Sequence, residues 1–180
     1  YAFEDLIDLF DQAQAVEPSG FAKSLSAYLR AADVEKRAAL ADLEGRARYQ
    51  IAQTYGSGAQ GLALAIAALE RMIAEMPKHA WVGRARAGIA EAYRASNQLG
   101  KAVLAYNVLL DWEDPVELSQ ETREVNARLR QTALFQKGAM FLALERPSEA
   151  IPVFQDYVGR YPTGAEWAQA QQSLIDAEYR

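Results

Sequence analysis

Few residues of this chain could do chemistry, and their surroundings argue against it. Residues 56–61 read GSGAQG and match G-x-G-x-x-G, the pattern that binds the pyrophosphate of a dinucleotide. Such a site needs a strand before the glycines and an acidic residue about 20 positions later. The preceding residues, RARYQIAQTY, have a helical pattern instead. We therefore interpret residues 56–61 as a flexible turn between two helices.

Histidine, cysteine and clustered acids are also scarce or badly spaced. His79 is the only histidine, so a catalytic triad or a histidine metal site would have to be built without a second imidazole. There is no cysteine, which excludes thiolate chemistry. Because His79 follows Pro77 at a helix junction, we expect it to face solvent or to start a helix. The acidic residues in 111–117 lack EF-hand spacing, and Asp5 and Asp8 lie on the polar side of a helix. We predict no catalytic residue, no metal and no cofactor, and a chain that is not an enzyme.

The composition predicts one helical domain. The chain has 180 residues, 51% of them hydrophobic, with much alanine and only six prolines, which favours helix over strand. A net charge of −5 argues against nucleic acid as a partner. No apolar run approaches the roughly 20 residues that span a bilayer. The chain begins at Tyr1 rather than at a methionine, so the presence of a signal peptide or a lipid anchor outside it stays an open question. Membrane association through such an anchor stays open with it.

Residues 134–162 have the pattern of two short amphipathic helices joined by a polar turn at 145–148. Small residues let two helix backbones approach closely, and an aromatic side chain from each helix fills the remaining gap. The residues in these roles are Leu134, Gly138 and Phe141 in the first helix, and Ala150, Phe154 and the terminating Pro162 in the second.

Two earlier segments repeat this pattern. The corresponding residues are Ala52, Tyr55, Ala65, Leu69 and Pro77 in one, and Ala90, Tyr93, Ala102 and Tyr106 in the other. Tyr55 and Tyr93 are 38 positions apart, but Tyr93 and Phe141 are 48 apart, so ten extra residues enter before the last unit. The residues at 120–130 are charged helix formers and predict a lengthened helix. The residues expected to start it are Asp114 as N-cap, Pro115 as N1 and Glu117 as N3.

Further helices flank the repeated units. Apolar stripes predict one helix that ends at Pro18, a second over residues 21–29 and a third over 34–55, for which Asp33 is a good N-cap. After Pro162, Thr163 and Glu166 form a capping box for a last helix with a polar back. A terminal helix of this kind suits the end of a repeat array.

The spacings of 12, 4 and 8 residues that join Gly138, Ala150, Phe154 and Pro162 resemble the tetratricopeptide repeat (TPR). The junctions between units are similar to those of bacterial envelope TPR proteins, such as the outer-membrane β-barrel assembly lipoprotein and the periplasmic TPR protein coupled to the Tol–Pal system. The residues that carry this likeness are Met76, Pro77, Trp81, Ala85, Ala90 and Tyr93 at one junction, and Tyr161, Pro162, Thr163, Trp167 and Ala170 at another.

The resemblance covers residues 46–180 and implies an all-α fold: a right-handed α-solenoid of TPR-like helix pairs with a C-terminal capping helix. Nine helices and no strand are expected. A single domain, 1–180, would comprise N-terminal helices (1–45), a first repeat (46–79), a second repeat (80–117), a third repeat with a lengthened first helix (118–164) and the capping helix (165–180).

Some residues depart from the family pattern or allow two interpretations. Lys137 replaces an apolar residue, and Tyr157 replaces a small one. Trp81, Trp112 and Trp167 lie at or near the junctions. We expect them to pack between repeats, and a stacking platform for a ligand is the alternative.

In TPR proteins the first helices of successive units line a concave groove that binds a partner. The carboxylate clamp of chaperone-binding TPR proteins is not matched, because Ala87 and Gly88 occupy positions that need polar side chains. By position, the resemblance assigns these residues to the groove: Arg46, Tyr49, Gln53, Arg84, Glu91, Arg94, Thr132, Phe135 and Leu142.

The function that the resemblance implies is a protein–protein interaction scaffold or adaptor in the bacterial cell envelope, in the periplasm or at the inner face of the outer membrane. Its partner would be a protein or peptide segment bound in the concave groove. A small-molecule-binding or transport-accessory TPR protein is the alternative. An open groove favours the peptide, and a closed cavity walled by aromatic residues favours the small ligand.

Overall fold

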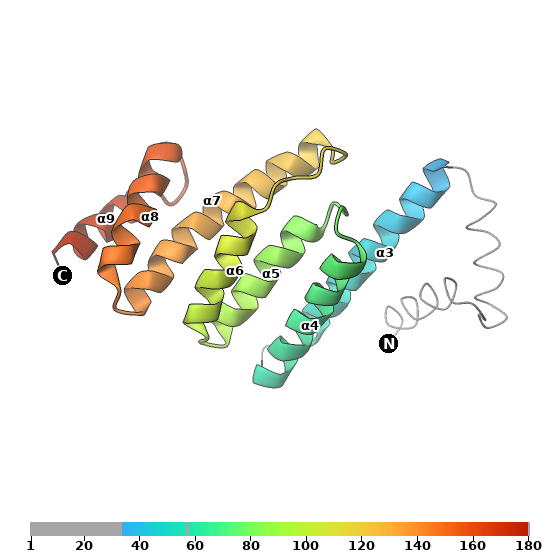
Figure 1. Ribbon diagram of the computed structural model, residues 1–180, viewed down its shortest axis with the longest axis horizontal. Helices are drawn as coiled ribbons and strands as arrows, with labels where there is room; N and C mark the ends of the chain where they lie inside the picture. Colours follow the sequence, from blue (N-terminus) through green and yellow to red (C-terminus); the bar gives the residue numbers. More distant parts are fainter. Residues whose placement is uncertain (1–33, 57, 180) are drawn as a thin grey trace.

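The computed structural model describes residues 34–56 and 58–179, and all the regular elements in this part of the chain are helices (Figure 1). The all-α prediction is confirmed for these residues. Two of the nine predicted helices, together with the expected N-cap Asp33, fall on residues 1–33 and lie outside the described part. The seven described helices are α3 (Val34–Thr54), α4 (Ala59–Glu75), α5 (Val82–Ala95), α6 (Leu99–Asp111), α7 (Gln120–Ala143), α8 (Pro147–Arg160) and α9 (Trp167–Glu178).

The helices follow one another in space in the order in which they follow in the chain (Figure 1). Each helix from α3 to α8 contacts the next one, and α7 also contacts both α5 and α9. Short connections join most neighbours, and the longest, between α6 and α7, spans residues 112–119. No described helix combines the length and the apolar character that a membrane crossing requires.

The contact between α7 and α8 is built as the spacing predicted. Phe154 and Ala150 of α8 are fully buried. A Cβ atom added at Gly138 of α7 would lie 2.8 Å from the ring of Phe154, closer than real Cβ contacts allow. The ring of Phe135 then meets Phe154 edge-on, with centroids 5.9 Å apart. Gly138 is therefore the residue that lets this aromatic pair close the gap between the helices.

The start of α7 differs from the prediction. The lengthened helix exists, but it begins at Gln120 with Ser119 as the N-cap, whose hydroxyl accepts a hydrogen bond from the Thr122 amide at 3.2 Å. Asp114 cannot cap it, because its carboxylate is used elsewhere. It accepts from Asn126 at 2.7 Å and forms an ion pair with Arg130 at 3.0 Å. These bonds pin residues 112–119 against the first half of α7.

The predicted capping box of the last helix is wrong. Glu166 occupies the N-cap position of α9, but no side-chain capping bond forms there. Its carboxylate instead accepts the hydroxyl hydrogen of Tyr157 at 2.6 Å. The Tyr157 side chain is fully buried, so its hydroxyl needs an acceptor, and this requirement outweighs the capping bond. Gly164 makes room, since an added Cβ would lie 2.8 Å from that hydroxyl.

Candidate partner-binding groove

A cavity of about 520 Å³ lies between α3, α4 and α5, and Leu129 of α7 closes part of it. Five of the nine residues predicted for the groove line this cavity, and they come from two helices. They are Tyr49 and Gln53 of α3, and Arg84, Glu91 and Arg94 of α5.

Helical periodicity brings these side chains together. Tyr49 and Gln53 are four positions apart and therefore share one face of α3. On α5, Arg84, Gly88 and Glu91 recur at spacings of four and three, so they also share a face. Small residues form the floor between the two walls: a Cβ added at Gly88 would lie 3.1 Å from the Leu69 side chain. The cavity is open here because α5 carries the small residues Ala87 and Gly88 in its lining. These are the two positions that would hold polar side chains in a carboxylate clamp.

Arg84 is held by aromatic contacts. Its guanidinium carbon lies 4.6 Å from the centre of the Trp81 ring, and the Tyr49 ring centroid lies 5.1 Å from that of Trp81. Among the described residues, no carboxylate lies within ion-pair distance of Arg84 (4.0 Å). Arg84 is therefore a positioned cation whose hydrogen-bonding capacity is available to a ligand.

Arg94, the second predicted cation, is already neutralised. Its guanidinium forms an ion pair with Glu91 at 2.6 Å. The other oxygen of Glu91 accepts the hydroxyl hydrogen of Tyr106 at 2.5 Å. Burial, and then the hydrogen bond to Glu91, raises the pKa of Tyr106 far above its usual value, so this hydroxyl stays protonated as a donor. Among the described residues of the groove, Arg84 is thus a cation without an ionic partner, and Arg94 and Glu91 form a compensated pair.

Four predicted groove residues lie elsewhere. The guanidinium carbon of Arg46 lies 5.7 Å from the centre of the Trp81 ring. Arg46 is nevertheless exposed, forms an ion pair with Asp42 and does not line the cavity. Thr132 lines a separate cavity of about 410 Å³ beside the start of α9. Phe135 is only 6% exposed and belongs to the core, and Leu142 is half-buried against the same core. Phe135 is drawn into the core because its ring packs against Phe154 and Tyr157 of α8, with centroids 5.9 and 5.7 Å apart.

The sequence-based mapping missed Trp81. We expected it to pack between repeats; its ring packs against Tyr49 of α3, and it also positions Arg84 on one wall of the cavity. Its spacing of three from Arg84 was a usable signal, because residues three apart on a helix are neighbours. The other tryptophans have packing roles: Trp112 lies under Arg86 and Arg130, and Trp167 donates to the Val158 carbonyl at 3.3 Å.

The connection between α3 and α4 is shorter than the predicted turn over residues 56–61, because α3 ends at Thr54 and α4 already begins at Ala59. Gly56 has a φ of +81°, a conformation that favours glycine. A Cβ added at Gly61 would lie 2.0 Å from the Tyr55 carbonyl oxygen, so this position also requires glycine. In the part of the chain that the structure describes, no strand precedes the segment.

His79 is half-buried between α3 and α5 rather than facing solvent. Its Nδ1 accepts from the Trp81 amide at 3.2 Å, and its Nε2 lies 3.1 Å from the Ala41 carbonyl oxygen. These two partners together require the neutral ring with its proton on Nε2. Gly45 makes the fit feasible, because a Cβ there would lie 2.2 Å from the imidazole.

We expect His79 to make the stability of the fold fall as the solution becomes acidic. Burial lowers the pKa of His79 below its usual 6.5, against the opposite effect of Asp42, the Ala41 carbonyl and Glu44. The unfolded chain therefore binds the proton first, so the stabilisation is present above pH 6.5 and is lost as pH falls through the lower, folded pKa. Urea unfolding of the parent and of His79→Asn at about pH 7.5 and 5.5 measures this. The variant should lose less stability between the two values, and equal losses would contradict the assignment.

Within the described residues, no group of three or more histidine or acidic side chains is arranged to hold a metal ion. Of the acidic residues in 111–117, Asp114 is taken up by Asn126 and Arg130, and Glu117 forms an exposed ion pair with Lys78 at 2.9 Å. Comparisons with protein-family models, with curated proteins and with solved structures give no match to this chain.

Proposed function

We propose that this chain is a scaffold or adaptor that binds an extended, acidic segment of a partner protein in the groove between α3 and α5. The observation that carries the proposal is Arg84, a cation without a carboxylate partner among the described residues, stacked on Trp81 beside an open cavity. Rows of packed helices offer surface to partners rather than an enclosed catalytic pocket.

The proposed architecture is a right-handed α-solenoid of TPR-like helix pairs, capped by α9. It is supported by the order of the helix contacts, in which each helix meets the next and α7 meets α5 and α9. Buried small residues at the repeated positions, Ala90, Ala102 and Ala150, agree with it. An envelope location, in the periplasm or at the inner face of the outer membrane, rests on the likeness of the junctions around Trp81 and Trp167 to those of envelope TPR proteins.

The groove favours a particular partner chemistry. A guanidinium can donate two parallel hydrogen bonds to one carboxylate, and such charge-assisted bonds are about twice as strong as neutral ones. Tyr49 provides an apolar face beside Arg84, and burial raises the pKa of its hydroxyl, which keeps it neutral and able to donate. Gln53 is exposed on the same wall and can bond to a peptide backbone. An extended segment with an acidic residue opposite Arg84 would provide hydrogen-bond partners for Arg84, Tyr49 and Gln53.

Arg84→Glu should weaken capture of the partner from native envelope extract by roughly tenfold or more, because a lost charged hydrogen bond costs about 1.5–3 kcal/mol and repulsion adds to it. Arg94→Glu should have a smaller effect, since Arg94 is already paired with Glu91. The loss should be larger in low salt than in moderate salt.

Arg160→Glu is the matched control, because it makes the same charge change at an exposed ion pair on α8 outside the groove. If folded Arg84→Glu, Arg94→Glu and their double variant capture the partner as well as the parent in both salts, the groove is not the binding site. The lengthened segment 116–130 would then be the next surface to test.

A further inference from the structure

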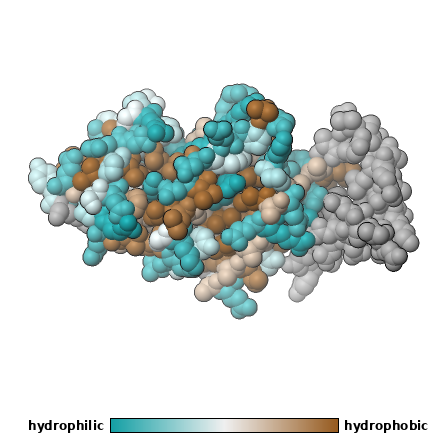
Figure 2. All heavy atoms as spheres, viewed as in Figure 1, coloured by the Kyte–Doolittle hydropathy of each residue, from teal (hydrophilic) through white to brown (hydrophobic). Residues whose placement is uncertain are grey.

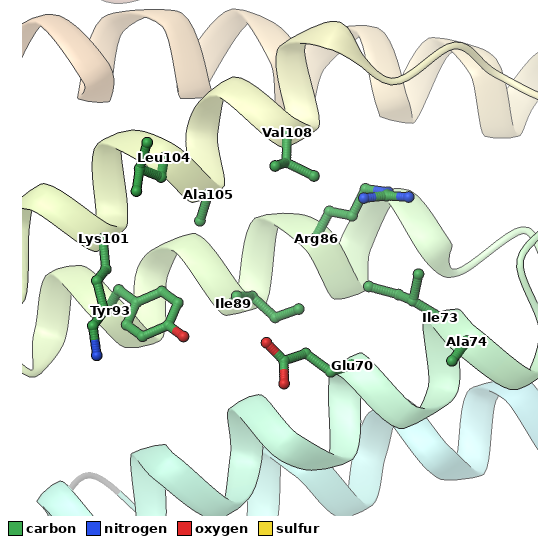
Figure 3. A pocket seen from close by; sticks show the side chains of 10 residues that line it. All are labelled: Glu70, Ile73, Ala74, Arg86, Ile89, Tyr93, Lys101, Leu104, Ala105 and Val108. Carbon is green, nitrogen blue, oxygen red and sulfur yellow. The ribbon is translucent and has the colours of Figure 1, made fainter.

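On the side of α5 that faces away from the groove, a second cleft of about 420 Å³ lies between α4 and α6 (Figure 3). Its lining on α5 includes Arg86, Ile89 and Tyr93, which recur at spacings of three and four and share a face. At 100° per residue this face is opposite to the one that carries Arg84 and Glu91. None of the described residues lines both sites, so a substitution in one leaves the lining of the other unchanged.

The cleft is apolar and partly open to solvent. Ile73 of α4, Ile89 of α5 and the pair Leu104 and Val108 of α6 line it. Leu104 is 64% exposed and Val108 is 51% exposed, and their spacing of four makes them a continuous ridge. Figure 2 shows hydrophobic atoms gathered over the middle of this face of the molecule, with hydrophilic atoms around them. Exposed apolar patches framed by polar residues mark interaction surfaces.

The charges around the cleft are mostly positive, in a chain whose net charge is −5. Figure 3 places Lys101 and Arg86 towards opposite ends of the apolar lining, and Glu70 is the only acidic residue among the described residues that line the cleft. Neither cation has a carboxylate at ion-pair distance among the described residues. Lys101 lies 5.5 Å from the centre of the Tyr93 ring.

Arg86 is held in place by a ring contact, but its hydrogen-bonding capacity is not fully used. Its guanidinium carbon lies 5.5 Å from the centre of the Trp112 ring. Its Nε atom is buried and has no hydrogen-bond partner. Burial also lowers the pKa of this guanidinium, so a nearby negative charge would favour its charged form.

We propose that this cleft binds an amphipathic helix of a partner protein, whose apolar stripe lies between α4 and α6 and whose acidic residues approach Lys101 and Arg86. A valley between two helices accepts the side-chain ridge of a third, and grooves of this kind bind helices through anchors at i, i+3, i+4 and i+7. The two cations at the ends of the valley, which pair with no described carboxylate, select acidic flanks and reject basic ones. The inference does not rest on the groove between α3 and α5.

The probes are two labelled synthetic peptides of about 18 residues, or five helical turns, with the same leucine stripe but flanked by glutamate in one and by lysine in the other. Fluorescence anisotropy should show that the parent chain binds the glutamate-flanked peptide roughly tenfold more tightly than the lysine-flanked one. Val108→Glu should lose most of this binding. Lys101→Glu should shift the preference towards the lysine-flanked peptide.

Leu64→Glu is the matched control for Val108→Glu, because Leu64 of α4 is also an exposed aliphatic residue (47% exposed) but does not line the cleft. It should bind both peptides as the parent does. The proposal is overturned if the parent binds neither peptide, if it binds both equally, or if Leu64→Glu loses as much affinity as Val108→Glu. It is also overturned if sedimentation shows a dimer that Val108→Glu dissociates, because the occupant would then be a second copy of this chain. Lys101 is exposed, so the Lys101→Glu comparison remains decisive if Val108→Glu fails to fold.

Discussion

Phe154→Ala is expected to lower the free energy of unfolding by about 3–5 kcal/mol. The Phe154 side chain is fully buried, its ring meets Phe135 edge-on, and it fills the space that Gly138 leaves open on α7. Removing the ring leaves a cavity between two helix backbones that Gly138 cannot fill. The measurement is urea unfolding followed by circular dichroism, in which the midpoint should fall with little change in slope.

Phe154→Leu is the matched control, since it keeps an apolar side chain at the same position. It should be destabilised clearly less than Phe154→Ala. A free energy of unfolding for Phe154→Ala within about 1 kcal/mol of the parent value would show that α7 and α8 are not tightly packed at Phe154.

Arg48→Ala should have an effect of similar size, about 3–5 kcal/mol, for an electrostatic reason. The Arg48 side chain is 6% exposed and forms ion pairs with Glu44 at 2.7 Å and with Glu75 of α4 at 2.8 Å. Removal of the guanidinium leaves Glu44, which is itself buried, without this partner and breaks a link between α3 and α4. Urea midpoints measure the loss.

Two comparisons separate this effect from the loss of a surface ion pair. Arg160→Ala removes an exposed pair with Asp156 and should cost at most about 1 kcal/mol. Arg48→Met combined with Glu44→Leu replaces both charges by apolar groups and should restore most of the stability. If Arg48→Ala costs no more than Arg160→Ala, the buried pair contributes nothing measurable.

Helical periodicity predicted the packed positions well where small and aromatic residues alternate. Gly138, Ala150 and Phe154 meet as expected, because their spacing alone decides which face each occupies. Periodicity failed at one position of α3, because Leu43 lies four residues before the buried Ala47 and a regular apolar stripe would bury both. Leu43 is 46% exposed, and Glu44 and Arg48 are buried in its place. Charged residues are usually outside, and among the described residues the ion pairs of Arg48 with Glu44 and with Glu75 of α4 offset the cost of this burial.

Local capping signals were the least reliable part of the sequence interpretation. Asp114 and Glu166 both stand where a capping carboxylate is expected, and both are bound by residues distant in the chain instead. Asn126 and Tyr157 are buried and each needs a carboxylate acceptor, and neither requirement can be seen in a window of a few residues. The starting residues of α7 and α9 were therefore predicted wrongly.

Five of the nine predicted groove residues lie together and four do not. One cavity is lined by Tyr49, Gln53, Arg84, Glu91 and Arg94, which all come from α3 and α5. Of the residues predicted on α7, Phe135 and Leu142 pack in or against the core, and Thr132 lines another cavity. Which arginine stays free could not be read from spacing, since it depends on the ion pair that Glu91 makes with Arg94.

The most direct test of the central claim, binding in the groove between α3 and α5, is site-specific photo-crosslinking in native envelope extract. A photoreactive residue is placed at Gln53, which is exposed and lines the groove, and in a second variant at Gln171, an exposed position on α9 outside it. We predict a discrete crosslinked partner with the Gln53 variant that is absent from the Gln171 variant and is lost when Arg84→Glu is added. A partner that crosslinks only from Gln171, or equally from Gln53 with and without Arg84→Glu, would contradict the claim.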